Sequence, residues 1–285
     1  MNILPNECIY EILVLLDPKK LLLCGQMNNN FYGLSQLASL WRNRIDGQYH
    51  VLFEKETWYE TCKLYHQLDV LNGKLMLYNR LCDLYQTTIV SPYNLYGLKS
   101  VPDGLELLPR LESLTLSGTQ LTDFSLKVPL TRLEYLYLKR NEFTYFPAEI
   151  CHLTKLKALD LGYNKLTNIP KMISRLTNLS IIWLNDNKIA NLPSYVKHLT
   201  NLVHLDCQNN KIKKIPAEIN QFISLRYLML NGNKLKNVPI EIKYMTNLFL
   251  LKIYNNQLTE KCIENLRKLI NVRYLHLYAH EDIVD

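Results

Sequence analysis

Hydrophobic residues recur with one spacing over residues 133–247, where the motif L-x-x-L-x-L-x-x-N-x-[LIF]-x-x-[LIVF]-P-x-x-[IV] is copied five times. The leucines that open successive copies are 23 residues apart: Leu133, Leu156, Leu179, Leu202, Leu225 and Leu248. Within each copy, the L-x-L step has a period of two, which predicts a short strand with alternate side chains buried. Self-similarity at a fixed period predicts a solenoid in which each repeat packs on its neighbours.

Weaker copies extend this pattern in both directions. One opens at Leu111, another opens at Val272, and a fragment near Leu98 keeps only the spacing of the second half of the motif. Terminal repeats are often atypical because they must cap the core. We therefore expect about seven to eight repeats over residues 95–285.

An asparagine and a proline recur inside the repeat. The asparagine follows each predicted strand, where its amide can pair with backbone groups of the turning chain. The asparagines are Asn141, Asn164, Asn187, Asn210, Asn233 and Asn256. The proline lacks a backbone N–H and can start the returning segment. The prolines are Pro147, Pro170, Pro193, Pro216 and Pro239. Cys207 occupies a leucine position, so we expect it to lie inert in the core.

This motif closely resembles that of the leucine-rich-repeat family, over roughly residues 95–280. The resemblance implies an α/β solenoid shaped as a horseshoe, with a parallel sheet on its concave face and short helices or irregular turns outside. It also implies that the concave face binds a partner.

Residues 1–48 lack the repeat. Leu4-Pro5 is followed by a stripe of apolar residues at helical spacing, which ends at Asp17-Pro18 because proline disfavours a helical predecessor. The segment LPNECIYEILVLLDPKKLLLCGQMNNNFYGLSQLASLWRNRI resembles an F-box, which typically reads L-P-x-E, a helix, L-D-P-x-D-L, a helix and a final L-W. Two departures from that pattern are Lys20, where an acidic residue is usual, and Met27, where a valine is usual.

The F-box resemblance implies a small all-α module that pairs with a Skp-type adaptor and, through it, with a cullin-RING ligase. A segment this short buries too little apolar surface to be robust alone. The candidate adaptor-binding residues are Leu4, Pro5, Ile9, Ile12, Leu16, Leu22, Met27, Phe31, Leu40 and Trp41. Periodicity does not separate those that face the adaptor from those that pack internally, and Trp41 could instead seat the F-box on the linker.

Residues 49–94 form the predicted connection between the two modules. Apolar residues in steps of three and four from Leu64 to Tyr85 predict an amphipathic helix that covers the open end of the first repeat. A break between two helices near Gly73 is an alternative, and a coiled coil is a weaker one because only about three heptads are present. The predicted division is an F-box at 1–48, a helical linker and cap at 49–94, and repeats at 95–285.

Composition narrows the class of protein. The 285 residues are 48% hydrophobic, which is ample for a core, and the seven cysteines are scattered without a C-x-x-C pair. We therefore expect a reduced cytoplasmic or nuclear protein, without a membrane anchor because the N-terminal apolar run is too short to span a bilayer. A net charge of +7 alone suggests nucleic acid, but 26 acidic residues are interspersed and no reading motif is present.

Motifs typical of enzymes are missing from the sequence. It contains no G-x-S-x-G, Walker-type glycine loop, H-E-x-x-H, or Cys/His cluster with ligand spacing. We expect no catalytic residue, no cofactor and no metal ion. An abundance of Asn, Lys, Ile and Tyr suggests an AT-rich coding sequence, as in large DNA viruses that carry F-box and repeat proteins; for such an origin the expected compartment is the host cytoplasm.

Strand residues that alternate with the buried leucines should face outward, and several are aromatic. The candidate partner-binding residues are Tyr135, Tyr137, Asp160, Tyr163, Trp183, His204, Asp206, Tyr227, Lys252 and Tyr254. Contiguous exposed apolar patches mark interaction sites, and aromatic residues are common binding hot spots. We expect Trp183 at the centre, with Tyr137, Tyr163, Asp160 and Asp206 as neighbours. The alternative is that these aromatic residues only satisfy β-propensity and pack across the ladder.

A lysine follows four of the recurring asparagines. These residues, the lysine row, are Lys165, Lys188, Lys211 and Lys234. With strands about 4.8 Å apart, four ammonium groups could line one edge and suit an acidic or phosphorylated segment. The alternative is an ordinary solvated face.

These patterns favour a non-enzymatic substrate-recognition subunit of an SCF-type cullin-RING ubiquitin ligase. In that hypothesis the F-box docks to the adaptor, and the repeats bind a target protein. The alternative hypothesis is a repeat scaffold that binds partners without any role in ubiquitin transfer.

Overall fold

The computed structural model of the chain describes residues 70–71, 74, 87–91, 96–127, 129–269 and 271–278. The chain divides into two compact units, one formed by 1–87 with 102–110 and the other by 88–101 with 111–285. The predicted F-box, with all ten of its candidate adaptor-binding residues, lies outside the described residues, and so does most of the predicted linker helix. The predicted division into three parts therefore stays a prediction.

The first unit contains the 3-10 helix η2 (Leu105–Leu107), which follows Gly104. Gly104 has a φ of 104°, a left-handed conformation that glycine adopts without steric penalty. A Cβ at this position would stand 3.5 Å from the Cβ of Leu71, which is buried. The tight turn before η2 therefore lies against Leu71.

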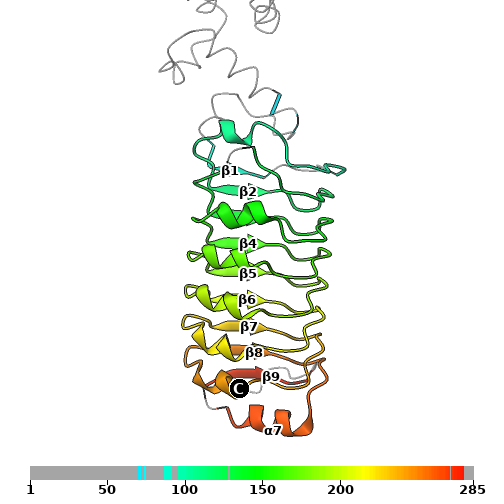
Figure 1. Ribbon diagram of the computed structural model, residues 1–285, viewed down its shortest axis with the longest axis vertical. Helices are drawn as coiled ribbons and strands as arrows, with labels where there is room; N and C mark the ends of the chain where they lie inside the picture. The colour runs from blue at the N-terminus through cyan, green and yellow to red at the C-terminus, as the bar shows by residue number, and fades with distance from the viewer. Residues whose placement is uncertain are drawn as a thin grey trace, which may run out of the picture. The chain divides into compact units, whose positions relative to one another are not determined.

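The second unit is built on one parallel sheet whose strands follow chain order (Figure 1). Among the described residues its strands are β1 (Ile89–Val90), β2 (Ser113–Thr115), β3 (Tyr135–Tyr137), β4 (Ala158–Asp160), β5 (Ile181–Trp183), β6 (His204–Asp206), β7 (Tyr227–Met229), β8 (Leu250–Lys252) and β9 (Tyr274–His276). The predicted leucine-rich solenoid with a parallel sheet is thus confirmed. β1 lies inside the range 49–94 that the sequence assigned to a linker and cap, so the degraded positions before Leu98 still supply a strand.

A short helix on the return path connects most successive strands. The 3-10 helices are η3 (Ala148–His152), η4 (Lys171–Arg175), η5 (Ser194–His198), η6 (Ala217–Gln221) and η7 (Ile240–Tyr244). Each of the five recurring prolines is the N-cap residue of one of them, which confirms the predicted role of proline. Its missing N–H costs nothing there because the first turn of a helix leaves that donor unpaired.

The return path before β9 differs. It holds an α-helix, α7 (Glu260–Arg267), which begins after Thr259 instead of a proline. The Thr259 hydroxyl accepts a hydrogen bond from the backbone N–H of Cys262 at 3.3 Å, as N-terminal capping residues do. Cys262 and Leu266 are the buried residues of this helix, so its apolar side covers the last turn of the solenoid core.

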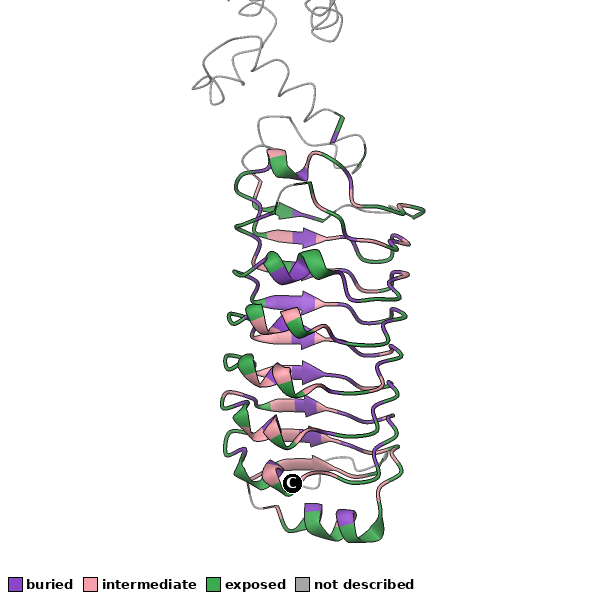
Figure 2. Cartoon of the chain, in the orientation of Figure 1, coloured by how far each residue is buried: buried purple, intermediate pink, exposed green. Residues whose placement is uncertain are grey.

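The core lies between the sheet and the return segments (Figure 2). From β2 to β8, the middle residue of every strand is buried, which confirms the predicted inward register of the L-x-L step. Cys207 is fully buried, and burial strongly raises the pKa of its thiol, so the thiol stays protonated. Its predicted role as an inert core residue fits this position.

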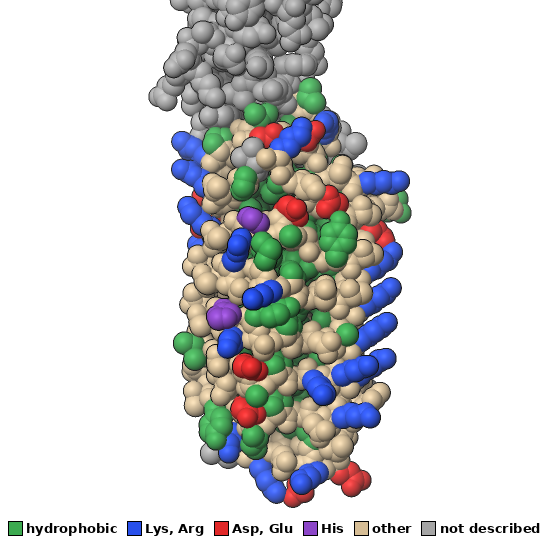
Figure 3. Space-filling view, in the orientation of Figure 1, with side chains coloured by type: hydrophobic (Ala, Val, Ile, Leu, Met, Phe, Trp, Pro, Cys, Tyr) green, Lys and Arg blue, Asp and Glu red, His purple; other side chains and the backbone are tan. Residues whose placement is uncertain are grey.

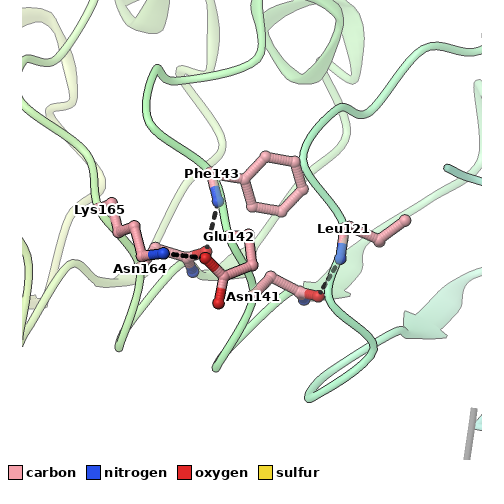
Figure 4. Close-up of polar contacts among 6 residues, drawn as sticks. All are labelled: Leu121, Asn141, Glu142, Phe143, Asn164 and Lys165. Atoms are coloured by element: carbon pink, nitrogen blue, oxygen red, sulfur yellow. Dashed lines mark hydrogen bonds and ion pairs between the residues drawn. The ribbon is translucent and has the colours of Figure 1, made fainter. Parts of the chain in front are cut away.

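The recurring asparagines form a continuous polar ladder beside the core. Asn210 donates from Nδ2 to the carbonyl oxygens of Leu184 at 2.8 Å and Cys207 at 3.1 Å, and its Oδ1 accepts from the N–H of Ile189 at 2.9 Å. Asn141, near the start of the array, makes the same kinds of hydrogen bond. Its Oδ1 atom accepts from the N–H of Leu121 at 2.8 Å (Figure 4). Each asparagine therefore joins its own repeat to the preceding one. The predicted pairing with backbone groups is confirmed.

The residue before each ladder asparagine turns the chain. It adopts a left-handed conformation in Arg140, Tyr163, Asp186, Asn209 and Asn255, with φ between 52° and 56°. Gly232 supplies the same conformation in the remaining repeat with φ 68°. Side chains other than glycine enter this region at a steric cost, so the surrounding hydrogen bonds must hold it. The ladder thus fixes the geometry at which each strand ends.

Candidate functional site

The face of the sheet directed away from the core, here named the open face, carries two columns of side chains. The first column is Tyr135, Ala158, Ile181, His204, Tyr227, Leu250 and Tyr274. The second is Tyr137, Asp160, Trp183, Asp206, Met229, Lys252 and His276. The parallel register brings each column together in the order that the sequence predicted. That the columns bind a partner stays a prediction.

Aromatic rings on the open face form a continuous series, here named the ring series. Its members are Tyr137, Trp183, His204, Tyr227, Phe249 and Tyr274. The centroids of successive rings are 6.5, 5.8, 5.8, 6.0 and 4.9 Å apart. These separations lie in the range at which tilted and edge-on aromatic rings attract one another. The series therefore links side chains from β3 to β9 across a single face.

Trp183 lies within the ring series and between two carboxylates. In the register of the sheet its neighbours are Asp160 on β4 and Asp206 on β6. Asp160 accepts from the N–H of Gly162 at 2.9 Å, and Asp206 accepts from the N–H of Gln208 at 3.0 Å. Both carboxylates are thereby tied to the turn that follows their strand. The half-buried indole of Trp183 therefore lies between two carboxylates whose positions are fixed by backbone hydrogen bonds.

Asp206 corrects one expectation from the sequence. It faces outward as predicted, but its side chain is buried, at 5% exposure, because Trp183 and Met229 flank it on the neighbouring strands. Burial raises the pKa of Asp206 to about 6, with further raising by the charges of Asp186 and Asp160. The hydrogen bond from Gln208 and the charge of Lys252 act against this increase. An outward register thus does not guarantee a solvated side chain.

Asp160 and His204, which also lie beside Trp183, are partly desolvated as well. Burial is the main cause that raises the pKa of Asp160, and the bond from Gly162 and the charge of Lys139 oppose it. Burial lowers the pKa of His204, which favours the neutral imidazole. Its Nε2 atom is buried and has no hydrogen-bond partner among the described residues. Buried polar atoms are usually paired, so this unpaired atom is an exception among the buried polar groups of the open face.

The remaining candidate residues occupy the margins of this centre. Tyr135 is exposed, whereas Tyr227, Lys252 and Tyr254 are half-buried. Tyr163 is exposed, and its ring lies under the Nζ atom of Lys139 at 5.1 Å and the Cζ atom of Arg140 at 5.3 Å. The sequence predicted Tyr163 as a neighbour of Trp183; in the part of the chain that is described, its ring contacts are these two cations.

Two residues of the open face were missed by sequence reasoning. Phe249 connects Tyr227 to Tyr274 in the ring series, and the Cζ atom of Arg273 lies 5.7 Å from the Phe249 ring centre and 5.6 Å from that of Tyr274. Both residues stand one position before their strands. The same position holds Glu134 and Lys157, which form an ion pair at 2.6 Å. The 23-residue period could have revealed this third column, because it relates Glu134, Lys157 and Phe249, and Arg273 follows Phe249 by 24 residues.

The lysine row lies along the edge toward which the strands point, where Figure 3 shows a line of basic side chains. All four lysines are exposed. Lys165 forms an ion pair with Glu142 of the preceding repeat (Figure 4). The other three make no ion pair with the residues that the structure describes. Within the described part of the chain, the charge of Lys165 is therefore paired with a carboxylate, and the charges of the other three lysines are not.

Within the described ranges, no group of three His, Cys, Asp or Glu side chains is placed to hold a metal ion. None of the helices in those ranges is long and apolar enough to cross a membrane.

Two family models match the repeats. A model described as "Leucine rich repeat" matches residues 109–166 and 131–189, and one described as "Leucine-rich repeat region" matches residues 181–284. These matches begin after the segment that resembles an F-box and therefore do not test that resemblance. No curated protein matches the chain.

Several solved structures are similar. A leucine-rich-repeat protein of Leptospira interrogans is 30% identical to this chain, with a TM-score of 0.57. The match covers 69% of this chain, and this chain spans 56% of the length of that protein. Internalin C2 from Listeria monocytogenes is 24% identical with a TM-score of 0.62, covering 80% of this chain and 96% of its own. The third structure is the ectodomain of the plant receptor kinase GASSHO1/SCHENGEN3 from Arabidopsis thaliana, solved in complex with CASPARIAN STRIP INTEGRITY FACTOR 2. It is 28% identical to this chain, with a TM-score of 0.50, and the match covers 62% of this chain and 22% of the ectodomain chain.

Proposed function

Because this chain is a leucine-rich-repeat protein, we propose that its open face binds a protein partner and that the chain recognises substrates for a cullin-RING ubiquitin ligase. The first half of the proposal rests on the ring series. Rings in mutual contact from β3 to β9 give a wide apolar surface of low conformational entropy, the kind of surface that supplies hot spots in protein interfaces.

The centre of this face combines apolar and polar recognition. Trp183 offers a ring, and the neighbouring Asp160 and Asp206 offer acceptors that are already fixed by backbone hydrogen bonds. A partner that covers Trp183 would also desolvate these carboxylates further, so it must bring donors or cations to them. The face therefore favours a partner segment in which apolar groups alternate with basic or hydrogen-bond-donating groups.

The ubiquitin-ligase part of the proposal rests on the resemblance of residues 4–45 to an F-box. In this scheme the F-box binds a Skp-type adaptor, and the chain acts in the cytoplasm or nucleus. The associated RING subunit and ubiquitin-conjugating enzyme carry the chemistry. The repeats contribute by holding the target near the transfer site, which raises the effective concentration of the reacting groups.

A pull-down with the Leu4→Ala/Pro5→Ala double variant tests the adaptor contact. The full chain should capture a Skp-type adaptor and a cullin, and the double variant should lose both, because the anchor residues of a small interface carry most of its binding energy. Circular dichroism should show the repeats folded in both proteins. Capture of the adaptor by the double variant at the level of the unaltered chain would rule out the F-box assignment.

The Trp183→Ala variant tests the open face. Because the side chain faces away from the core, we expect thermal unfolding to change by less than about 1 kcal/mol, and partner capture to weaken by about 2 kcal/mol, or roughly thirtyfold. Tyr244→Ala is a matched control, since Tyr244 is an exposed aromatic residue on η7 and not on the sheet. A loss of about 3 to 5 kcal/mol in stability would instead identify Trp183 as a core residue.

A second function is a binding scaffold without a role in ubiquitin transfer. It is favoured by the plant receptor ectodomain, in which similar repeats form a complex with a partner factor. The two functions give different results in the same pull-down. The scaffold predicts partner capture through Trp183 without any adaptor or cullin.

A further inference from the structure

A second surface lies outside the open face, where the chain leaves the ladder and approaches η7. It is a groove of about 690 Å³ lined by Lys213, Lys214, Ile215, Lys234, Lys236, Asn237, Val238, Pro239 and Gln257. Four of these nine residues are lysines, and none is a carboxylate. Of the lysine row only Lys234 lines the groove. The other three lysines follow later in their repeats and were not singled out from the sequence.

None of the four lysines in the groove forms an ion pair with a described residue. Lys213 and Lys236 are 23 residues apart and so occupy equivalent positions in consecutive repeats, as do Lys211 and Lys234. Strands that are neighbours lie about 4.8 Å apart, and like charges at such positions repel. The repulsion contrasts with Lys165, whose charge is matched by Glu142 in the preceding repeat. An anionic ligand in the groove would relieve it.

An apolar hollow adjoins the cationic groove. It has a volume of about 290 Å³, shares Asn237, Val238 and Pro239 with the groove, and continues over Ile240 toward α7. Its lining includes Leu266 and Leu269, and Lys261 is its single charged lining residue among those that the structure describes. Ile240 is 58% exposed, so its side chain is available to an apolar group of a ligand. The combined surface thus presents positive charge beside an apolar depression.

We propose that this surface binds an extended acidic segment of a protein, with its carboxylates over the lysines of the groove and an adjacent apolar side chain in the hollow by Ile240. Among the described residues, no aromatic side chain lines the groove or the hollow. Proteins that bind single-stranded nucleic acid without sequence preference stack bases on aromatic rings, so the aliphatic lining favours a peptide. This surface is separate from the open face and does not depend on the function proposed for that face.

Fluorescence anisotropy with the full chain tests the charge contact. The probe is a labelled peptide that carries four glutamates followed by a leucine, and the variant is Lys213→Gln/Lys236→Gln. We expect its affinity to fall by roughly fivefold to tenfold, because each surface ion pair contributes modestly. The matched control is Lys155→Gln/Lys171→Gln, which removes the same charge from exposed positions outside the groove. It should change the affinity less than about twofold.

Two further measurements make the test decisive. Replacing the leucine of the peptide by serine should weaken binding to the unaltered chain but have no additional effect on an Ile240→Ser variant. A single-stranded oligonucleotide of equal charge should bind more weakly than the peptide. Equal losses in the two lysine variants would show attraction to total charge only and overturn the proposal. Tighter binding of the oligonucleotide, lost in the groove variant, would overturn it in favour of nucleic acid.

Discussion

The asparagine ladder and the lysine row stand one residue apart in four repeats, yet they have opposite roles. Asn210 is buried, and both ends of its amide are hydrogen-bonded to backbone groups of two repeats. Lys211 is exposed and makes no ion pair with the described residues. The same 23-residue period thus carries one set of side chains that joins the repeats and one set that stays exposed at the surface. A shared period indicates shared geometry and not a shared role.

The strands show the same contrast between adjacent positions. Leu205 lies in the core at 3% exposure, whereas Asp206 faces outward and is covered only by its neighbours on the open face. Both are buried by area, but only the leucine is surrounded by core hydrocarbon. The exposed fraction alone does not distinguish the two residues. The strand register does, because it directs Leu205 toward the core and Asp206 toward the open face.

The largest effect should come from Leu205→Asp. A charge placed between the sheet and the return segments has no partner there, so we expect a loss of at least about 4 kcal/mol in unfolding free energy. Asp206→Ala should change it by less than about 1 kcal/mol, because it removes one hydrogen bond and also relieves the cost of a desolvated carboxylate. Chemical denaturation of both variants measures the contrast. Equal losses would mean that the inward and outward assignments are wrong.

A smaller but still large effect is expected from Asn210→Ala. The change removes one hydrogen bond from each of the carbonyls of Leu184 and Cys207, which keep their bonds from Asn187 and Asn233, and it leaves the N–H of Ile189 without its side-chain partner. The lost hydrogen bonds and the unpaired buried N–H should lower the free energy of unfolding by about 3 kcal/mol. The adjacent Lys211→Ala should stay within about 0.5 kcal/mol in the same denaturation experiment. If the two variants were equally stable, the ladder would not be what joins the repeats.

The smallest effect concerns the pH dependence of Asp206. Its pKa is about 6 in the folded chain and near 3.9 in an unfolded one, so between these values the folded state binds a proton that the unfolded state has lost. Stability contributed by this group therefore falls as the pH rises from about 4 to about 6, and the loss persists above that range. The Asp206→Asn variant lacks this loss.

Denaturation of the unaltered chain and of Asp206→Asn at pH 4 and pH 7.5 measures this difference. Relative to the unaltered chain, the variant should gain roughly 2 kcal/mol between the two pH values. Asp186→Asn is a control, because Asp186 is only one of the charges that act on Asp206. A stability difference that did not change with pH would show that Asp206 is better solvated than its burial indicates.

The repetitive sequence was informative because the fold is built from one unit. The spacing of the leucines was enough to predict parallel strands, and the recurring asparagines and prolines were correctly assigned to the ends of strands and the starts of the returning segments. Contacts in a solenoid join each repeat mainly to its neighbours, so residues 23 apart are almost always adjacent in space. Fixing the period therefore also fixed the register of the columns.

Departures from the period were harder to predict. α7 replaces the proline-initiated 3-10 turn, and β1 forms from residues that show little of the motif. Phe249 enters the ring series from a position before its strand, which the alternation of strand residues does not reveal. In the first two cases the local sequence departs from the repeat, whereas Phe249 lies at a variable position of a repeat that keeps the motif.

The sequence by itself determined the solenoid, the inward face of each strand and the asparagine ladder, because these features follow from the motif that is repeated along the chain. Only the tertiary structure decided how the open face and the edge are solvated. Asp206 is desolvated by Trp183 and Met229 from other repeats, and the cationic groove combines Lys213 with Lys236 and adjoins a hollow lined by an exposed isoleucine on η7. Burial and charge at one position depend on side chains that stacking brings near, and these differ from repeat to repeat although the backbone does not.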